Sequence, residues 1–419
     1  MKALLLSHSD GGGGAGRAAY RLHQALRASG VESRMRVDFT DNSDPDVMRT
    51  TGILRDLRRR IRITGEQLPG ISARVSNPGL FSPALTSAAR TSTIDAIGAD
   101  IVNVHWINMG FMSIAQLGRI RTPSVWTLHD MWAFTGGRHY TPEGPDARWR
   151  GAYLNGNAPK DDSRWDVDRW VWNRKRRRWT TPRQLVTPSR WLAGLAQESA
   201  LLSDWPVEVI PNALDTDVFR PYPQAEARAF HRLPPDAPLV LFALTTDLDD
   251  PRKGWDLLKD ALRRLRLDRP DVELAVLGHD APPGQWADDL PRAHWLGRLN
   301  EDRALAMAYS AADVTVVPSR QDNLPQTGTE AQACGCPVVA FRIGGLSDVL
   351  VHGETGFLAD DLAPSSLAAG LAWVLEDSTR HHELAASARE RAVRLWSPAV
   401  VSDQYKELFA TVIQASPKA

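Results

Sequence analysis

Residues 312–340 of the chain are ADVTVVPSRQDNLPQTGTEAQACGCPVVA. The apolar run that ends at Val317 predicts a buried strand. A helix is predicted over Gln326–Cys334, because a proline stands just before its start and a glycine just after its end. A second apolar run, which begins at Val338, predicts the next strand. A strand, a helix and a strand in this order are typical of a parallel sheet covered by helices.

Two carboxylates, Asp322 and Glu330, lie on either side of the start of this helix, with seven residues between them. Asp322 is on the loop where the first strand ends, and ligands of open α/β sheets bind at that edge. Carboxylates there accept hydrogen bonds from sugar and ribose hydroxyls, while the N–H groups of a helix start favour phosphate. The stretch therefore predicts a ligand site at the carboxyl edge of a sheet.

The same alternation of short apolar runs and longer amphipathic stretches extends over the whole chain, which predicts an α/β fold with parallel sheets. Strands are expected at Lys2–Leu6, Arg34–Phe39, Ile101–His105, Val125–His129, Gln184–Thr187, Glu208–Ile210, Leu239–Leu244, Glu273–Leu277, His294–Leu296, Val314–Val317 and Val338–Phe341. Helices are expected at Gly16–Ala28, Leu54–Ile63, Ile114–Ile120, Trp165–Trp179, Arg190–Ala200, Trp255–Leu265, Arg303–Ala311, Gln326–Cys334, Ser365–Leu375 and from Pro398 toward Gln414.

The length of 419 residues exceeds what one typical core holds and suits two α/β domains. We predict an N-terminal Rossmann-like domain over residues 1–212 and a C-terminal one over residues 237–396. The segment 213–236 between them is rich in proline, which continues neither a helix nor a central strand, and is predicted to be a linker. The last helix, about residues 397–415, is expected to pack back on the first domain.

Composition excludes several classes of protein. The 50 basic and 50 acidic residues give no formal net charge, which argues against nucleic acid as a partner. Cys334 and Cys336 have no second pair with which to form a zinc site, and no metal is expected. The run Ala3–Leu6 is too short for a signal peptide, and no stretch reaches the ~18 apolar residues of a membrane span. A cytoplasmic protein is therefore expected.

A glycine loop, Gly11–Gly16, follows the first predicted strand and includes Gly13 and Gly14. The backbone of such a loop, followed by a helix, approaches an anion closely. The loop also satisfies the G-x-G-x-x-G pattern of dinucleotide-binding proteins, and Asp38 follows at the end of the next predicted strand. Three interpretations stay open: a loop that faces an anion or acceptor, a structural loop, and the NAD site of an oxidoreductase.

Asp322-x7-Glu330, followed by Ala331–Ala340, resembles the acidic E/D-x7-E motif of glycosyltransferase family 4, a retaining family with the GT-B fold. Further pieces of the resemblance are the glycine loop, Thr127–Asp130, Thr187–Arg190, Val209–Asn212, Arg252–Gly254, His294–Gly297 and Gly353–Leu358. Within the family, Leu128–Gly137 is most similar to bacterial exopolysaccharide transferases of the colanic-acid type. The resemblance implies two Rossmann-like, doubly wound parallel-sheet domains that face a cleft.

The resemblance also implies roles for individual residues. Glu330 is expected to bind the donor ribose and Asp322 the transferred sugar, while Lys253 neutralises the donor phosphates. The remaining expected contacts are Asn323, Leu324 and Pro325 along the diphosphate and sugar, Gly278, Arg298 and Leu299 near the base, His129 near the sugar, and Gly13 and Gly14 in the glycine loop. Many family members carry an arginine where this chain has Leu248, and Arg252 is expected to take its place.

Two basic stretches suggest a surface partner. Residues Arg164–Arg183 hold eight basic residues and four tryptophans, and a second stretch holds Arg55, Arg58, Arg59, Arg60 and Arg62. Basic faces with tryptophan suit an anionic membrane surface or a polyprenyl-diphosphate acceptor. The alternative is a solvated helix that packs its tryptophans on the N-terminal domain.

These observations together predict a retaining glycosyltransferase that uses a nucleotide-diphosphate sugar and needs neither metal nor cofactor. Its acceptor is expected to be a saccharide or a polyprenyl-diphosphate-linked saccharide in exopolysaccharide synthesis, at the inner face of the plasma membrane. The alternatives are an NAD-dependent oxidoreductase and a catalytically silent module that binds nucleotide sugars.

Overall fold

The computed structural model describes residues 1–40, 42–49, 55–73, 75, 81–154, 156–158, 165–244, 247–282 and 286–416. Of the predicted positions, Leu54 and Arg164 lie outside the described residues, as does the side chain of Arg55. The chain forms two compact units. Unit 1 comprises Met1–Asn212 and Val401–Ala419, and unit 2 comprises Ala213–Val400.

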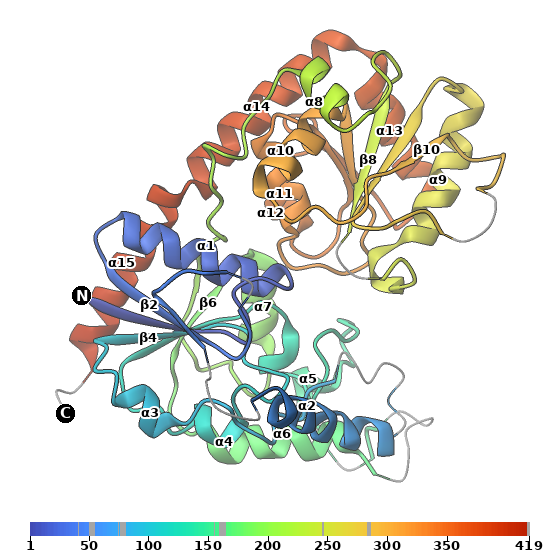
Figure 1. Cartoon of the computed structure of the whole chain (residues 1–419). Helices are drawn as coiled ribbons and strands as arrows, with labels where there is room; N and C mark the ends of the chain where they lie inside the picture. Colours follow the sequence, from blue (N-terminus) through green and yellow to red (C-terminus); the bar gives the residue numbers. More distant parts are fainter. Residues whose placement is uncertain are drawn as a thin grey trace. The chain divides into compact units, whose positions relative to one another are not determined.

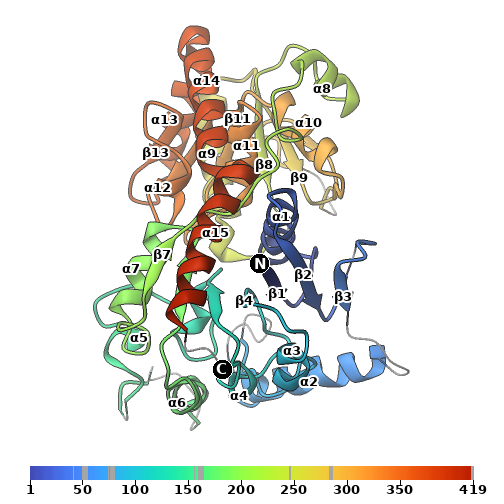
Figure 2. The same ribbon diagram turned by 90° about the vertical axis from the view of Figure 1, so that its left-hand side faces the viewer.

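Unit 1 is built on a seven-stranded sheet of order β3-β2-β1-β4-β5-β6-β7, in which all pairs are parallel (Figure 1). Its strands are β1 (Lys2–Leu6), β2 (Glu32–Val37), β3 (Val47–Arg49), β4 (Ile101–Val104), β5 (Ser124–Thr127), β6 (Gln184–Thr187) and β7 (Val207–Val209). Its helices are α1 (Gly14–Ala28), α2 (Arg55–Ser72), α3 (Thr91–Asp95), α4 (Ile114–Leu117), η2 (Met131–Ala133), α5 (Arg148–Gly151), α6 (Val167–Arg178), α7 (Arg190–Glu198) and most of α15 (Pro398–Ala415). Helix α1 lies on one face of the sheet, and α3, α4 and α6 lie on the other (Figures 1 and 2).

Unit 2 has a six-stranded, all-parallel sheet of order β10-β9-β8-β11-β12-β13. Its strands are β8 (Leu239–Ala243), β9 (Glu273–Leu277), β10 (Ala293–Trp295), β11 (Val314–Val317), β12 (Val338–Phe341) and β13 (Gly356–Ala359). Its helices are α8 (Gln224–Phe230), η3 (Pro251–Lys253), α9 (Trp255–Asp268), α10 (Asp302–Ala311), α11 (Gln326–Ala333), α12 (Leu346–Val349), α13 (Pro364–Glu376) and α14 (Ser378–Trp396).

Strand β8 shows why these apolar runs form a sheet that is buried on both faces. Leu239 and Leu241 join one core, whereas Val240 and Phe242 join the other. Successive side chains of a strand point to opposite faces, so a continuous apolar run supplies two cores at once.

The strand order decides where a ligand site can form. In both sheets the chain starts in the middle, winds to one edge and then returns to the other side of its first strand. This change of direction, the switch point of the sheet, falls between β1 and β4 in unit 1 and between β8 and β11 in unit 2. Loops that leave two such strands diverge, and ligands of doubly wound sheets bind in the crevice between them. The prediction of two doubly wound parallel-sheet domains is confirmed.

Several elements differ from the sequence prediction. The segment predicted to be a linker contains α8, which starts directly after Pro223 and so avoids a proline in its interior. Helix α14 was not predicted because its buried stripe is Leu384, Ala388, Ala392 and Trp396, and two alanines give a weak apolar signal. Strands β3 and β13 were also missed, since each is short and β13 begins with glycine.

Among the described residues, none of the helices combines the length and the apolar character that a bilayer crossing requires.

Candidate active site

The predicted ligand residues of unit 2 lie on the two loops that diverge at its switch point. Lys253 and Arg252 are in η3, which follows β8, and Asp322 is on the loop that follows β11. Gly254 fixes how closely these loops approach, because its φ is +69° and a Cβ there would overlap the carbonyl oxygen of Pro318. The Arg320 backbone N–H also donates to the Arg252 carbonyl at 2.7 Å. The two loops are thus joined through their backbones.

Asp322 is the centre of this arrangement. Lys253 Nζ donates to Asp322 Oδ2 at 2.7 Å, and Ser319 Oγ donates to the same oxygen at 3.3 Å. The backbone N–H of Asn323 donates to Oδ1 at 3.0 Å. Burial would raise the pKa of Asp322, but the charges of Lys253 and Arg252, with these hydrogen bonds, lower it below its usual range. Asp322 is therefore a carboxylate held in a fixed orientation.

Arg252 takes a different position from Lys253. Its guanidinium forms an ion pair with Asp250 at 3.0 Å, and Nη1 donates to the Gln321 carbonyl at 3.3 Å. Arg252 thus contacts the backbone of the loop that carries Asp322. Its charge also contributes to the lowered pKa of Asp322. Leu248, at the position where the family often has arginine, packs partly buried against the core.

Glu330 lies on α11 and is buried. Its Oε2 accepts a hydrogen bond at 3.0 Å from the hydroxyl of Tyr309 on α10. Asn323, Leu324 and Pro325 form the buried turn that enters α11, and Pro325 is its N-cap residue. Sequence reasoning missed Tyr309, because its hydrogen bond to Glu330 depends on how α10 packs against α11.

The residues expected near a base lie farther along the same edge. Gly278 follows β9, which is two strands from β11, and Arg298 and Leu299 follow β10. Gly278 has φ +103°, a Cβ there would overlap the Leu244 carbonyl, and its N–H donates to the Gly297 carbonyl at 2.8 Å. The Arg298 side chain is exposed, and Leu299 packs against the core. These three residues share the sheet edge of Asp322 without lying beside it.

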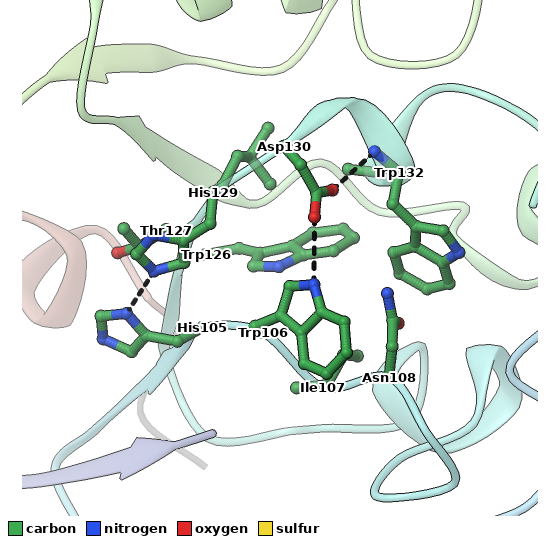
Figure 3. Close-up of a pocket in the computed structure, with 11 residues that line it drawn as sticks. His105, Trp106, Ile107, Asn108, Trp126, Thr127, His129, Asp130 and Trp132 are labelled. Atoms are coloured by element: carbon green, nitrogen blue, oxygen red, sulfur yellow. Dashed lines mark hydrogen bonds between the residues drawn. The ribbon is translucent and has the colours of Figure 1, made fainter. Parts of the chain in front are cut away.

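His129 and its neighbours line a pocket in unit 1, at the carboxyl ends of β4 and β5 (Figure 3). His105, from the end of β4, and His129, from the end of β5, stack with ring centroids 5.3 Å apart, and their Nδ1 and Nε2 atoms are 3.0 Å apart. Burial lowers the pKa of His129 to about 4, although Asp130 opposes this shift, and burial also lowers the pKa of His105 well below its usual value. Both rings are neutral at pH 7, so one donates to the other.

Asp130 organises the other side of this pocket. Its carboxylate accepts hydrogen bonds from Trp106 Nε1 at 3.0 Å and from the Trp132 N–H at 2.8 Å (Figure 3). It also accepts from His139 Nδ1 at 2.7 Å. Burial would raise the pKa of Asp130, but His139 and these hydrogen bonds lower it. Asp130 and His139 were not among the predicted site residues, although Asp130 is adjacent to His129 in the sequence.

Helix α6, from the stretch rich in arginine and tryptophan, packs against the segment that lines this pocket. Lys175 is fully buried and donates to the carbonyls of Trp132, Thr135 and Gly136, at 3.3 Å for Thr135 and 2.7 Å for Gly136. Asp168 accepts from the Gly137 N–H at 2.9 Å. Since Trp172 and Trp179 are also buried, these residues correspond to the packing alternative. Trp165 of the same stretch is exposed, and the membrane contact of the stretch stays a prediction.

The glycine loop places Gly13 at the N-cap of α1 and Gly14 as its first residue, at the end of β1. The structure requires a glycine at position 16, because a Cβ on Gly16 would overlap the Gly11 carbonyl. Asp38, the acid that an NAD site would need, accepts both its short hydrogen bonds from Arg62 Nη2, at 2.8 and 2.9 Å. A carboxylate engaged in this way is poorly placed to accept from a ribose.

Among the described residues, no group of three or more His, Cys, Asp and Glu side chains is arranged to hold a metal ion.

Two family models match successive parts of the chain. Residues 12–218 match the model described as Glycosyltransferase Family 4, and residues 224–391 match Glycosyl transferases group 1. The chain belongs to glycosyltransferase family 4. The predicted family is thus confirmed, whereas the exopolysaccharide subgroup stays a prediction.

Curated relatives of this family member carry the name D-inositol 3-phosphate glycosyltransferase. The relative from Xylanimonas cellulosilytica is 36% identical over 212 residues, which are 47% of this chain and 49% of the relative. The relative from Jonesia denitrificans is 27% identical over 91% of this chain and 87% of its own length. The chain spans about half the length of the first of these relatives in the matched region.

Solved structures confirm the GT-B fold. Sucrose-phosphate synthase from Thermosynechococcus elongatus has a TM-score of 0.68 at 21% identity, covering 99% of this chain and 100% of the other. Alr3699/HepE from Anabaena, in complex with UDP-glucose, has a TM-score of 0.63 at 18% identity, covering 98% of this chain and 100% of the other. At these identities the likeness concerns the fold.

Proposed function

We propose that the chain is a retaining glycosyltransferase that moves a sugar from a nucleotide-diphosphate donor to an acceptor. One observation carries the proposal: the Lys253–Asp322 pair lies at the switch point of unit 2, directly before the helix that carries Glu330. The cation and the helix start suit the diphosphate of such a donor, the ionised Asp322 carboxylate suits hydroxyls of its sugar, and Glu330 suits those of its ribose.

The chemistry assigns a part to each of these groups. When the bond between the sugar and the diphosphate breaks, negative charge grows on the leaving phosphate, and fixed positive charge lowers the barrier. Lys253 commits one of its three N–H donors to Asp322, and a donor phosphate takes the others. Asp322, held by Lys253 and Asn323, accepts from hydroxyls of the transferred sugar, and Glu330 accepts from the ribose. No resident metal or cofactor takes part in this proposal.

The donor is proposed to be a uridine diphosphate sugar, since a structure of this fold has been solved with UDP-glucose. Two acceptor classes follow from different observations. The names of the curated relatives favour a polyol phosphate such as D-inositol 3-phosphate, and the similarity of Leu128–Gly137 to exopolysaccharide transferases favours a saccharide or lipid-linked saccharide. The inner face of the plasma membrane stays the predicted location.

The test is release of nucleoside diphosphate and formation of glycoside, measured with UDP-sugars and both acceptor classes. Lys253→Ala and Glu330→Ala are each expected to lower kcat/KM by about 10²–10³. The control is Lys406→Ala, which removes a lysine from an exposed pair with Asp403 at 2.8 Å, close to the 2.7 Å of the Lys253–Asp322 pair. Full activity in both site variants would remove the proposed site.

The two alternatives give different outcomes in the same experiment. A silent nucleotide-sugar module would bind the donor and release no diphosphate with any acceptor. An oxidoreductase would bind NADH in a fluorescence titration, and Gly14→Ala would weaken that binding.

A further inference from the structure

Helix α2 (Arg55–Ser72) carries an apolar stripe that faces solvent. Leu57, Ile61, Leu68 and Ile71 are 53%, 63%, 54% and 54% exposed. Their spacing of four, seven and three residues places them on one side of a helix. The exposed Thr64 lies on the same side, between Ile61 and Leu68. Single exposed apolar residues are ordinary, but an apolar stripe on a protein surface marks an interaction site.

The opposite side of α2 is fixed to unit 1. Glu66 is buried, and its Oε1 accepts from the backbone N–H groups of Leu85 and Thr86 at 2.8 and 2.6 Å. Arg62 forms the ion pair with Asp38, and Gly70 lies against Phe81. The helix therefore has a polar and small-residue side turned inward and its apolar side turned outward, which is the reverse of an ordinary surface helix. In both views α2 lies at the periphery of unit 1 (Figures 1 and 2).

Positive charge flanks the outward stripe. Arg58 and Arg60 are exposed, and in helical projection they lie on either side of the line through Leu57, Ile61 and Leu68. The helix contains five arginines against Asp56 and Glu66, and Glu66 is turned inward. Two copies of this face packed together would bring like charges into contact, whereas anionic headgroups would neutralise them.

We infer that α2 is an interfacial helix that docks unit 1 on an anionic lipid bilayer. The apolar stripe enters the boundary between headgroups and acyl chains, and Arg58 and Arg60 lie at the level of the phosphates. Helix α2 belongs to unit 1 and the residues of the proposed donor site belong to unit 2, so the inference is tested independently of the transferase activity.

The experiment is vesicle flotation with the full chain. Vesicles of phosphatidylcholine and phosphatidylglycerol in equal parts are expected to carry the protein, and vesicles of phosphatidylcholine alone are not. Binding is expected to weaken as salt is added, because the arginine contribution is screened. Absence of binding to the anionic vesicles would overturn the inference.

Paired variants assign the binding to α2. Ile61→Asp with Leu68→Asp, and separately Arg58→Glu with Arg60→Glu, are each expected to lower the partition coefficient by about tenfold or more. The matched control is the double variant Leu267→Asp with Arg264→Glu on α9. Leu267 is 85% exposed and Arg264 is also exposed. This control variant is expected to bind the vesicles as the unchanged chain does. Wild-type flotation by the α2 variants would contradict the inference. Because these side chains are exposed, circular dichroism should show that every variant folds.

A labelled cysteine reports insertion directly. Ile61→Cys, carrying an environment-sensitive dye, should shift to shorter emission wavelength only with the anionic vesicles, and Leu267→Cys should not. An Ile61→Cys probe whose emission changes with protein concentration but not with vesicles would identify a second copy of the chain as the occupant, and would reject the bilayer.

Discussion

Lys253 and Asp322 form an ion pair whose side chains are 21% and 9% exposed, so neither charge is well hydrated. Lys253→Met leaves Asp322 with Ser319 and the Asn323 N–H as its close donors, and the free energy of unfolding at pH 7 is expected to fall by roughly 1–3 kcal/mol. Lys406→Met, in the exposed pair, should change it by less than about 1 kcal/mol. Chemical unfolding of both variants measures the difference.

The same pair gives a pH dependence with a definite sign. The folded-state pKa of Asp322 is below its unfolded value of about 3.9, so the contribution to stability is complete above that value. It is lost as pH falls through the lower, folded-state pKa. The difference in unfolding free energy between the unchanged chain and Lys253→Met should therefore shrink as the pH is taken below about 4. A difference that grows on acidification would show that another group accounts for it.

The glycine loop offers a matched pair of substitutions that separates its structural and functional interpretations. A Cβ at Gly16 would overlap the Gly11 carbonyl, and Gly16→Ala is expected to destabilise unit 1 by about 1–3 kcal/mol. A Cβ at Gly14 meets nothing within 4 Å, so Gly14→Ala should leave stability within about 1 kcal/mol. If the loop faces a ligand, Gly14→Ala lowers activity in spite of its normal thermal unfolding. Unchanged activity would make the loop structural.

At the scale of elements, the sequence predicted the strands and helices that follow from local patterns of apolar and polar residues. The strands β1, β8, β9 and β11 were predicted from their apolar runs, and the position of Asp322 between a strand and a helix followed from the same pattern. Contacts between elements were not predictable in this way. Nothing in the sequence near Glu330 indicates that Tyr309 on α10 donates to it, because that hydrogen bond depends on how two helices pack.

Helix α6 shows that the composition of a helix does not predict which of its faces is buried. Its composition suggested a membrane surface, yet Lys175 has the helical spacing of its apolar neighbours Val171, Trp172 and Trp179, which is the sign of a lysine on the buried side. The helix α2, less rich in tryptophan, is the one whose apolar stripe is exposed. Composition alone does not tell which face of a helix the fold covers.

Lys175 therefore carries a prediction for the element that it supports. Lys175→Met removes the donor for the carbonyls of Trp132, Thr135 and Gly136, and the contact of Nζ with the Trp132 ring at 3.9 Å. We expect unit 1 to lose roughly 2–4 kcal/mol of unfolding free energy. The exposed Arg177→Met on the same helix should change stability by about 0.5 kcal/mol or less. Equal stability of the two variants in chemical unfolding would show that the three carbonyls find other donors.

At the scale of the molecule, the two units differ in how the chain builds them. Unit 1 is discontinuous: it needs α15, whose Tyr405 hydroxyl lies 3.0 Å from Thr127 Oγ1 and whose Phe409 is fully buried. Unit 2 is continuous, and all six strands of its sheet and both of its cores come from residues 213–400. A fragment of residues 213–400 should therefore fold alone, whereas a fragment of residues 1–212 should not.

The fragment 213–400 also contains Lys253, Asp322 and Glu330, which are proposed to hold the diphosphate, the sugar and the ribose of the donor. It is expected to bind UDP and to gain about 2.7 kcal/mol of stability when UDP is present at a hundred times its dissociation constant. Glu330→Gln in the fragment should weaken UDP binding, because the ribose loses its carboxylate acceptor, while the exposed Arg264→Gln should not. Calorimetric titration measures both, and the fragment should form no glycoside with any acceptor. A fragment that folds but binds UDP equally well with and without Glu330 would place the ribose elsewhere, and one that does not fold would show that the cores of unit 2 depend on the rest of the chain.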